Sequence, residues 1–135
     1  MIVRSARKSD VKQLVKLDRE AKREIKWWTP YKAKDFLKVM RKNNSLFVAE
    51  DKSIIAGYIS GRIIKKMLVL DNVFVLKKYR QKHIAMKLIN KFISVWKSSR
   101  PKEIRLFCPE RLRKFYEKMG FEVTSLEMKR KFKLL

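Results

Sequence analysis

The sequence predicts a single-domain fold of the mixed α/β (α+β) class, with a central twisted sheet of about six to seven strands, mostly antiparallel, flanked by four helices. Residues 46–62 have the alternation of two strands joined by a tight turn, which indicates an antiparallel hairpin. Residues 84–96 carry apolar side chains at the helical period. Strand-like segments precede and follow that helix, and this order favours a right-handed parallel crossover. The predicted sheet is therefore mixed.

Length and composition fit one compact unit. The chain has 135 residues, of which 46% are hydrophobic, enough to form a single core. We therefore expect residues 1–135 to form one domain. No apolar run approaches the ~20 residues of a membrane helix, and the first residues do not resemble a signal peptide. We expect a soluble, cytoplasmic protein without membrane association.

Positive charge dominates the composition. Lys and Arg number 36 against 13 Asp and Glu, for a net charge of +23. Such a field attracts polyanions, which favours association with nucleic acid or a ribonucleoprotein, and repels polycationic substrates. Because the basic residues occur in every segment, a second interpretation stays open: a lysine-rich solvated surface typical of proteins from hot or lysine-biased proteomes.

Cysteine and histidine are scarce. With Cys108 as the only cysteine, no intramolecular disulfide can form, and with a single histidine we expect no metal site. We interpret Cys108 as a small buried hydrophobic residue.

The first part of the chain predicts a strand and two helices. Residues 1–6 form the strand, and Asp10 caps a helix in which Gln13 completes a capping box. The apolar face of this helix comprises Val11, Leu14, Val15, Ala21 and Ile25. Thr29-Pro30 has the pattern of a second helix start, and that helix would bury Phe36, Leu37 and Met40.

The remaining elements alternate between strands and helices. The hairpin pairs residues 46–50 with 54–62, and Gly57 and Gly61 favour a bulge or a close backbone contact in its second arm. A long strand at 67–76, the helix at 84–96 and a strand at 103–107 follow. A fourth helix starts at Pro109 and ends at Gly120, and the last two strands are predicted at 121–124 and 126–135.

Residues 71–89 carry the clearest functional signal. They run from a strand through a short basic turn directly into the helix at 84–96. Such a turn leaves several backbone N–H groups unpaired at the positive end of the helix dipole. The stretch therefore predicts a phosphate-binding site.

Several segments carry a family resemblance. Residues 47–50 and 55–59 resemble the central hairpin of the GCN5-related N-acetyltransferase (GNAT) family, and residues 115–121 resemble its fourth helix and following strand. Residues 79–85, Tyr-Arg-Gln-Lys-His-Ile-Ala, are similar to its acetyl-CoA signature. The resemblance spans essentially the whole chain and implies the GNAT-like acyl-CoA N-acyltransferase fold.

Three positions depart from the family pattern. The family usually has glycine at the position of His83 and often has glycine at the position of Gln81. Pro109 stands where the family often has asparagine, whereas Ala85 fits the family pattern. A side chain at His83 is tolerated if it points away from the turn and its backbone has ordinary helical angles, which we expect because His83 lies at the start of a helix. The imidazole could be exposed or packed on the helix, or it could donate to a phosphate.

The resemblance implies acetyl-CoA as cosubstrate. Backbone groups of Val73, Phe74 and Val75 would bind the pantetheine arm, and one N–H would polarise the thioester carbonyl. Arg80 and Lys82 would add charge beside the pyrophosphate. The backbone N–H groups that would hold the pyrophosphate are those of Gln81, Lys82, His83, Ile84, Ala85 and Met86.

The resemblance also implies catalytic residues. Tyr116 matches the tyrosine that protonates or hydrogen-bonds the leaving sulfur, and Asp71 stands where many relatives carry a general base. Asp71 could instead orient the substrate or be structural, and Glu50 is a weaker candidate. Trp27 and Trp28 lie in the segment that forms one wall of the acceptor site. Stacking on a substrate and closing the core both stay open for this pair.

Two functional hypotheses follow. The first is an N-acetyltransferase that transfers acetyl from acetyl-CoA to a primary amine, such as a protein N-terminus or a lysine, by direct attack through a tetrahedral intermediate. The alternative is a GNAT fold without catalysis that serves as a basic nucleic-acid-binding module. Saturable acetyl-CoA binding distinguishes the two.

Overall fold

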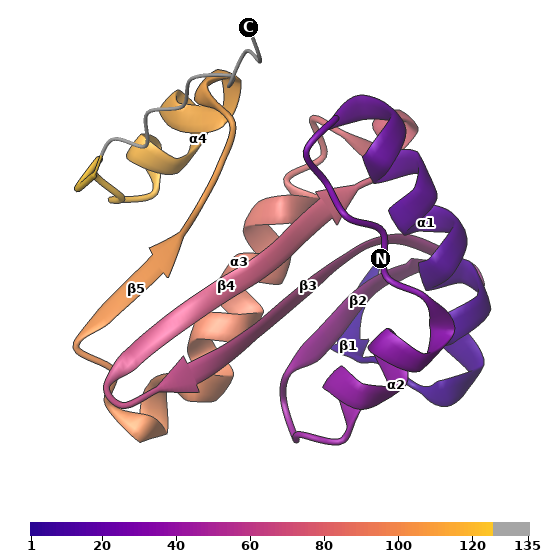
Figure 1. Cartoon of the computed structure of the whole chain (residues 1–135), viewed down its shortest axis with the longest axis horizontal. Helices are drawn as coiled ribbons and strands as arrows, with labels where there is room; N and C mark the ends of the chain where they lie inside the picture. Colours follow the sequence, from indigo (N-terminus) through magenta and orange to yellow (C-terminus); the bar gives the residue numbers. More distant parts are fainter. Residues whose placement is uncertain (126–135) are drawn as a thin grey trace, which may run out of the picture.

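A five-stranded sheet forms the centre of the protein in the computed structural model, which describes residues 1–125 (Figure 1). The strands follow chain order: β1 (Ile2–Ser5), β2 (Leu46–Asp51), β3 (Ile54–Ile64), β4 (Met67–Val75) and β5 (Glu103–Leu106). Neighbouring strands are antiparallel from β1 to β4, and β4 and β5 are parallel. The helices are α1 (Val11–Glu24), α2 (Ala33–Met40), α3 (Ile84–Trp96) and α4 (Arg113–Lys118).

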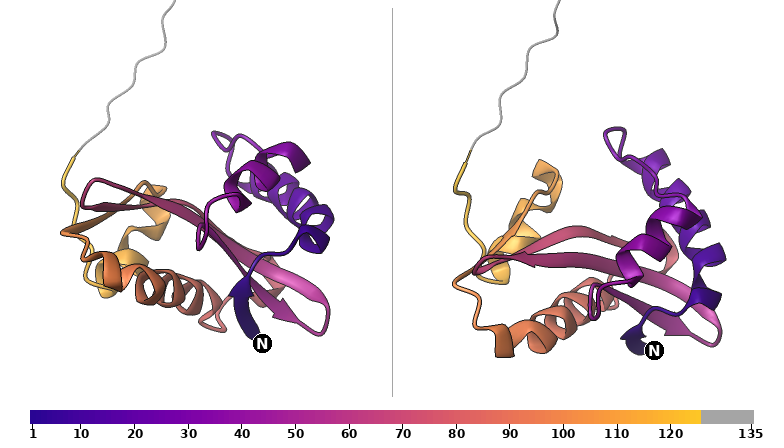
Figure 2. Two further views of the ribbon diagram at one scale, coloured as in Figure 1. Left: turned by 90° about the horizontal axis from the view of Figure 1, so that it is seen from below. Right: turned by 60° about the horizontal axis from the view of Figure 1, so that its bottom comes forward.

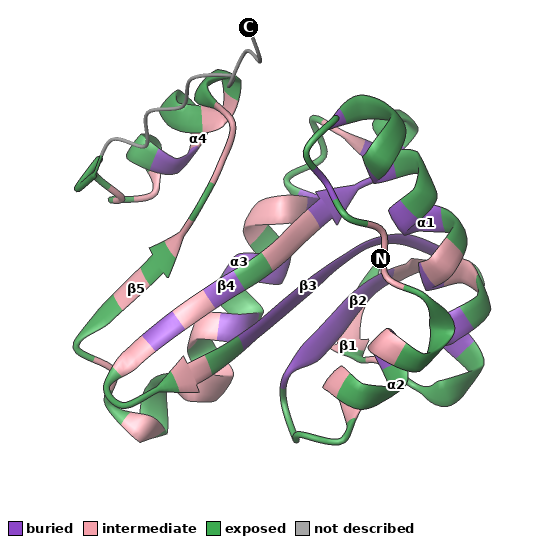
Figure 3. Ribbon diagram, in the orientation of Figure 1, coloured by how far each residue is buried: buried purple, intermediate pink, exposed green. Residues whose placement is uncertain are grey.

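Helices cover both faces of this sheet. Figure 2 shows α1 and α2 on one face and α3 on the other. On the α3 face, Leu88, Ile89 and Phe92 pack against Ile59 and Leu68 in one buried cluster. The central strands are accordingly the most buried elements of the chain (Figure 3). Among residues 1–125, no helix has the length and apolar character that a bilayer-crossing segment requires.

The predicted fold class is confirmed, with one difference in strand number. The sheet is mixed, mostly antiparallel and flanked by four helices, but the described part of the chain contributes five strands. Residues 121–124, predicted as a strand, form none, and the exposed Val123 packs on no sheet face. The strand predicted at 126–135 lies outside the described residues.

The capping box predicted at the start of α1 does not form. The Gln13 side chain instead bridges α1 to the β2–β3 hairpin, donating to the Ser53 carbonyl at 3.0 Å and accepting from the Ile55 N–H at 2.8 Å. Asp10 accepts from the Arg7 N–H at 2.7 Å and from both terminal nitrogens of Arg4 at 2.8 and 2.9 Å. Asp10 therefore bonds back to Arg4 and Arg7, and Gln13 bonds the hairpin, in place of the predicted cap of α1.

Helix α2 starts at Ala33, later than the Thr29-Pro30 pattern predicts. Its first turn is capped by Asp35, whose carboxylate accepts from the Lys32 N–H at 2.8 Å. Of the predicted apolar face, Phe36 is fully buried whereas Leu37 is exposed.

A buried carboxylate explains this late start. Asp18 on α1 accepts hydrogen bonds from the Trp28 indole at 3.0 Å, the Tyr31 N–H at 2.6 Å and the Tyr58 hydroxyl at 2.5 Å. Burial raises the pKa of the Asp18 carboxyl, and the three donors oppose that shift. Because two of the donors belong to residues 25–32, Asp18 holds this connection in a non-helical path.

The bulge predicted in the second arm of the hairpin lies beside Gly57: Ala49 pairs with Gly57 and Glu50 pairs with Ile55, so Ala56 is an extra residue on β3. A second bulge lies opposite Gly61, on β4. Ser60 pairs with Asn72 and Gly61 pairs with Leu70, so Asp71 is an extra residue on β4. A Cβ atom on Gly61 would lie 2.5 Å from the Phe92 ring, and therefore only glycine fits.

Candidate active site

Strands β4 and β5 separate halfway along β4. They pair only from Met67–Glu103 to Leu70–Leu106, and no described strand pairs with the outer edge of β4 from Asp71 to Val75. In an antiparallel pair, alternate residues direct their N–H and C=O groups to the same side. Since the Leu76 N–H donates to the Ala56 carbonyl, the backbone groups of Val73 and Val75 face the open edge and those of Phe74 face β3.

A cleft lies where the two strands part. It brings together most of the residues predicted for catalysis and acceptor binding, from the α1–α2 connection, β4 and α4. Its lining includes Trp27, Trp28, Asp71, Val73, Cys108 and Tyr116. Residues up to 89 positions apart in the sequence therefore share one site.

The turn before α3 has an unusual backbone. Gln81 and His83 have φ angles of +66° and +59°, in the left-handed region, and both side chains are exposed. The expectation of ordinary helical angles at His83 is therefore wrong. The chain turns from β4 into α3 within a few residues, and positive φ at these two positions makes this reversal. Glycine would adopt the same angles without strain.

This backbone leaves six consecutive N–H groups available, from Gln81 to Met86. None of them donates to a group within residues 1–125, and the first donor of α3 is the Lys87 N–H, which donates to the His83 carbonyl at 3.0 Å. Left-handed residues in a turn direct successive N–H groups into a concavity suited to an anion. We call residues 81–86 the cradle.

Arg80 connects the cradle to two other elements. Its Nε donates to the Val75 carbonyl at 3.0 Å, its terminal nitrogen pairs with Glu24 at 2.5 Å, and its guanidinium lies 5.4 Å from the centre of the Phe74 ring. The Val75 carbonyl is thus already occupied. Lys82, predicted to add charge beside the phosphates, lies over the Tyr79 ring at 5.6 Å.

Tyr116 is held inside the cleft. Its ring packs edge-on against Phe115 and Phe121, with centroids 5.0 and 5.8 Å away, and the residue is 8% exposed. Burial, with a contribution from the charge of Cys108, raises the pKa of Tyr116 to about 12. The phenol is therefore protonated at neutral pH and can act as a hydrogen-bond donor.

Cys108 is half-buried rather than fully buried. It lies in the cleft beside Tyr116 and forms no disulfide. Burial, and then the negative charge of Glu110, raises the pKa of the Cys108 thiol, which keeps it protonated.

The two carboxylates considered as a base differ in position. Asp71 lines the cleft and pairs with Nε of Arg62, at 3.1 and 3.3 Å from its two oxygens. Glu50 does not line the cleft and instead accepts from Arg4, at 2.5 and 3.0 Å. Glu50 is thus placed as a structural acid, and Asp71 stays the candidate base.

The two tryptophans have separate roles in packing. Trp28 is 6% exposed and donates to Asp18, so it closes the core. Trp27 is 62% exposed and lines the cleft. Trp28 also lines the cleft but is held in the core, whereas Trp27 has most of its surface available to contact an acceptor.

Sequence reasoning missed Asp18 and Arg62. A signal for Asp18 was present, because it is an acid among the apolar positions of α1, next to Leu17 and four residues after Leu14. Arg62 shows no local signal, since it meets Asp71 only through the β3–β4 pairing.

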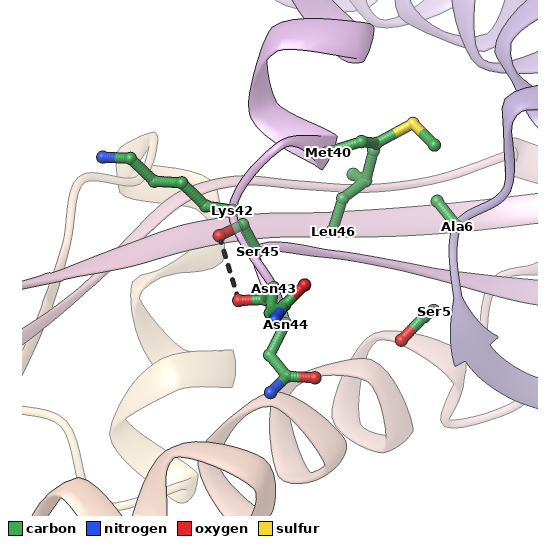
Figure 4. A pocket seen from close by; sticks show the side chains of 8 residues that line it. All are labelled: Ser5, Ala6, Met40, Lys42, Asn43, Asn44, Ser45 and Leu46. Carbon is green, nitrogen blue, oxygen red and sulfur yellow. Dashed lines mark hydrogen bonds between the residues drawn. The ribbon is translucent and has the colours of Figure 1, made fainter.

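A larger hollow of about 320 Å³ lies elsewhere, where the end of β1 meets the α2–β2 connection (Figure 4). Its lining is largely polar, with Lys42, Asn43, Asn44 and Ser45 among its residues. No predicted site residue borders it, so the cleft is the better candidate site.

Known proteins share this sequence pattern and fold. The sequence model described as "Acetyltransferase (GNAT) domain" matches residues 16–133. No curated protein sequence gives a significant match.

Solved structures resemble the chain over nearly its full length. Glucosamine-6-phosphate N-acetyltransferase from Arabidopsis thaliana superposes with a TM-score of 0.74 at 18% identity, covering 98% of each chain. A transcriptional regulator from Bacillus halodurans superposes with a TM-score of 0.78 at 20% identity, covering 97% of this chain and 99% of that chain. Aminoglycoside N-acetyltransferase AAC(6')-Iy in complex with CoA superposes with a TM-score of 0.76 at 15% identity, covering 98% of this chain and 100% of that chain. At these identities the likeness shows the fold.

Proposed function

The chain belongs to the GNAT acetyltransferase family, and from this premise we propose that it transfers the acetyl group of acetyl-CoA to a primary amine. One observation carries the proposal. The cradle with six available N–H groups, the open edge of β4 and the Tyr116 phenol follow one another along the gap between β4 and β5. These are the parts that binding a pyrophosphate, aligning a thioester and stabilising a departing thiolate require.

Cofactor binding divides between two stretches of backbone. The pyrophosphate of acetyl-CoA would accept hydrogen bonds from the N–H groups of the cradle, with Lys82 nearby. The pantetheine amides would pair with the open edge of β4 at Val73 and at the Val75 N–H, because Arg80 already occupies the Val75 carbonyl. The Val73 N–H lies at the cleft and would donate to the thioester carbonyl. Phe74 makes no backbone contribution, because its polar groups face β3.

The acetyl transfer itself needs two proton movements. The amine nitrogen forms a bond to the acetyl carbon through a tetrahedral intermediate, and the bond from that carbon to sulfur then breaks. Asp71 takes the amine proton, directly or through water, and Tyr116 donates to the sulfur. With a pKa of about 12, Tyr116 stabilises the thiolate mainly by a hydrogen bond.

The acceptor amine approaches past Trp27. This ring is the exposed aromatic on the α1–α2 wall of the cleft and can pack against the carbon chain next to the amine. A lysine side chain meets this requirement because its amine stands on a flexible apolar stem, and a protein N-terminus can meet it through the side chain of its first residue.

A second candidate function is a nucleic-acid-binding module without catalysis. Two observations favour it: residues with side chains occupy the left-handed positions of the cradle, and the net charge is +23. The two functions differ in one property, because the module has no need to bind acetyl-CoA.

The test is thiol release from acetyl-CoA in the presence of peptides that carry either a free N-terminus or a lysine. We expect release to depend on the peptide and Tyr116→Phe to lower kcat more than it weakens acetyl-CoA binding in calorimetry. Equal turnover in the variant would remove Tyr116 from the mechanism. A lack of saturable acetyl-CoA binding would exclude the enzyme and leave the module.

A further inference from the structure

Lysine and arginine have different roles on this surface. Every ion pair within residues 1–125 uses an arginine: Arg4, Arg23, Arg62, Arg80, Arg105 and Arg113. Every lysine in the same part of the chain is exposed, and none joins an ion pair. Arginines therefore supply the cation of each of these ion pairs, and the lysine charges stay available to a partner.

Exposed cations line up along α1, and among them only Arg23 joins an ion pair within residues 1–125, with Glu20 at 2.8 Å. Lys12, Lys16, Arg19 and Arg23 recur at spacings of four, three and four residues, which places them on one side of a helix. All four are exposed, and the helical spacing places them opposite the buried positions Leu14, Leu17 and Ala21. We call these four residues the α1 stripe. It is about 16 Å long at 1.5 Å per residue.

The α1 stripe leads toward an exposed aromatic ring. α1 ends at Glu24, and Trp27 follows within three residues, with 62% of its surface exposed. Cations that follow a sugar-phosphate backbone and an aromatic ring on which a base can stack are the two components of single-stranded nucleic-acid binding. An acidic polypeptide would use the cations but has no base to stack on the ring.

We propose that the α1 stripe and Trp27 bind single-stranded nucleic acid, with phosphates along the stripe and one base stacked on the Trp27 ring. Because Trp27 also lines the cleft, the bound strand ends beside the acceptor entrance. An amine presented on a ribonucleoprotein would thereby be brought to the site. This last step rests on the proposed acetyl transfer, whereas the binding surface does not.

The test is fluorescence anisotropy of a labelled 20-nucleotide oligouridylate, titrated with the full chain at several salt concentrations. Each phosphate contact contributes roughly 0.7 to the slope of log affinity against log salt. Lys12→Gln/Lys16→Gln/Arg19→Gln should therefore reduce the slope by about 2. Lys91→Gln/Lys97→Gln/Lys102→Gln removes the same charge from exposed positions outside α1 and should leave the slope nearly unchanged.

A second variant separates stacking from charge. Trp27→Ala should weaken binding about tenfold without changing the slope, because a stacked base contributes no counterion release. Equal slopes in the two triple variants would mean that the charge acts diffusely and would overturn the proposal. So would unchanged affinity in Trp27→Ala, or polyglutamate of equal charge competing as well as the oligonucleotide.

Acetyl-CoA calorimetry on the same proteins keeps the two proposals separate. We expect both triple variants to bind acetyl-CoA as the unmodified chain does, since neither touches the cradle. If the unmodified chain binds the oligonucleotide as described but does not bind acetyl-CoA, the proposed acetyl transfer is wrong, whereas the proposal that the α1 stripe binds nucleic acid is supported.

Discussion

Replacing Gln81 and His83 with glycine should make the protein more stable. Both residues have φ near +60°, where a side chain costs roughly 1–2 kcal/mol that glycine does not incur. Each glycine also makes the unfolded chain more flexible, which lowers the gain in the free energy of unfolding by about 0.4–1 kcal/mol. Because both side chains are exposed, little packing is lost. The expected net gain is roughly 0.5–1 kcal/mol per site, or about 1–2 kcal/mol for the double variant.

Urea unfolding followed by circular dichroism measures this change as a free energy of unfolding. Lys91→Gly, at an exposed position inside α3, is the matched control and should lose about 1 kcal/mol, because glycine is a poor helix former. Acetyl-CoA affinity should be equal or higher in the double variant. A double variant less stable than the original chain would refute the assignment of strain to these two residues.

Two further predictions concern buried carboxylates. Tyr58→Phe removes one of three donors to Asp18 and should cost about 1.5–3 kcal/mol in urea unfolding; a loss below 0.5 kcal/mol would show that the buried carboxylate does not depend on this donor. Arg4→Ala should cost about 3 kcal/mol at pH 7. Burial alone would raise the pKa of Asp10, but its bonds with Arg4 and Arg7 lower that pKa below the unfolded value near 3.8. The stability that the Arg4–Asp10 pair contributes is therefore present above pH 3.8 and is lost as pH falls through the folded pKa. The difference between Arg4→Ala and the original chain should therefore shrink between pH 7 and pH 3, and a constant difference would contradict this linkage.

Local patterns were sufficient for the elements that position the cleft. The bounds of α3 were predicted correctly, because apolar residues on its buried face recur at the helical period over more than three turns. The β2–β3 hairpin and the bulge beside Gly57 in its second arm were likewise visible, since alternation and glycine placement are properties of the strand itself.

Features set by long-range contacts were not predictable. The start of α2 depends on Asp18, which bonds Tyr31 from 13 positions away and overrides the Thr29-Pro30 start signal. Gln13 had a local partner available in Asp10 but bonds the hairpin instead. The left-handed angle of His83 follows from the path between β4 and α3, and a propensity argument at the helix start favoured ordinary helical angles.

Comparison of acetyl-CoA with acetyl-pantetheine by calorimetry tests the central claim most directly. The two ligands share the thioester and the pantetheine arm, but only acetyl-CoA carries the pyrophosphate that the cradle would bind. We predict saturable binding of acetyl-CoA and at least tenfold weaker binding of acetyl-pantetheine, with the difference falling as salt rises. Equal affinity for the two ligands, or no saturable binding of acetyl-CoA, would contradict the role of residues 81–86.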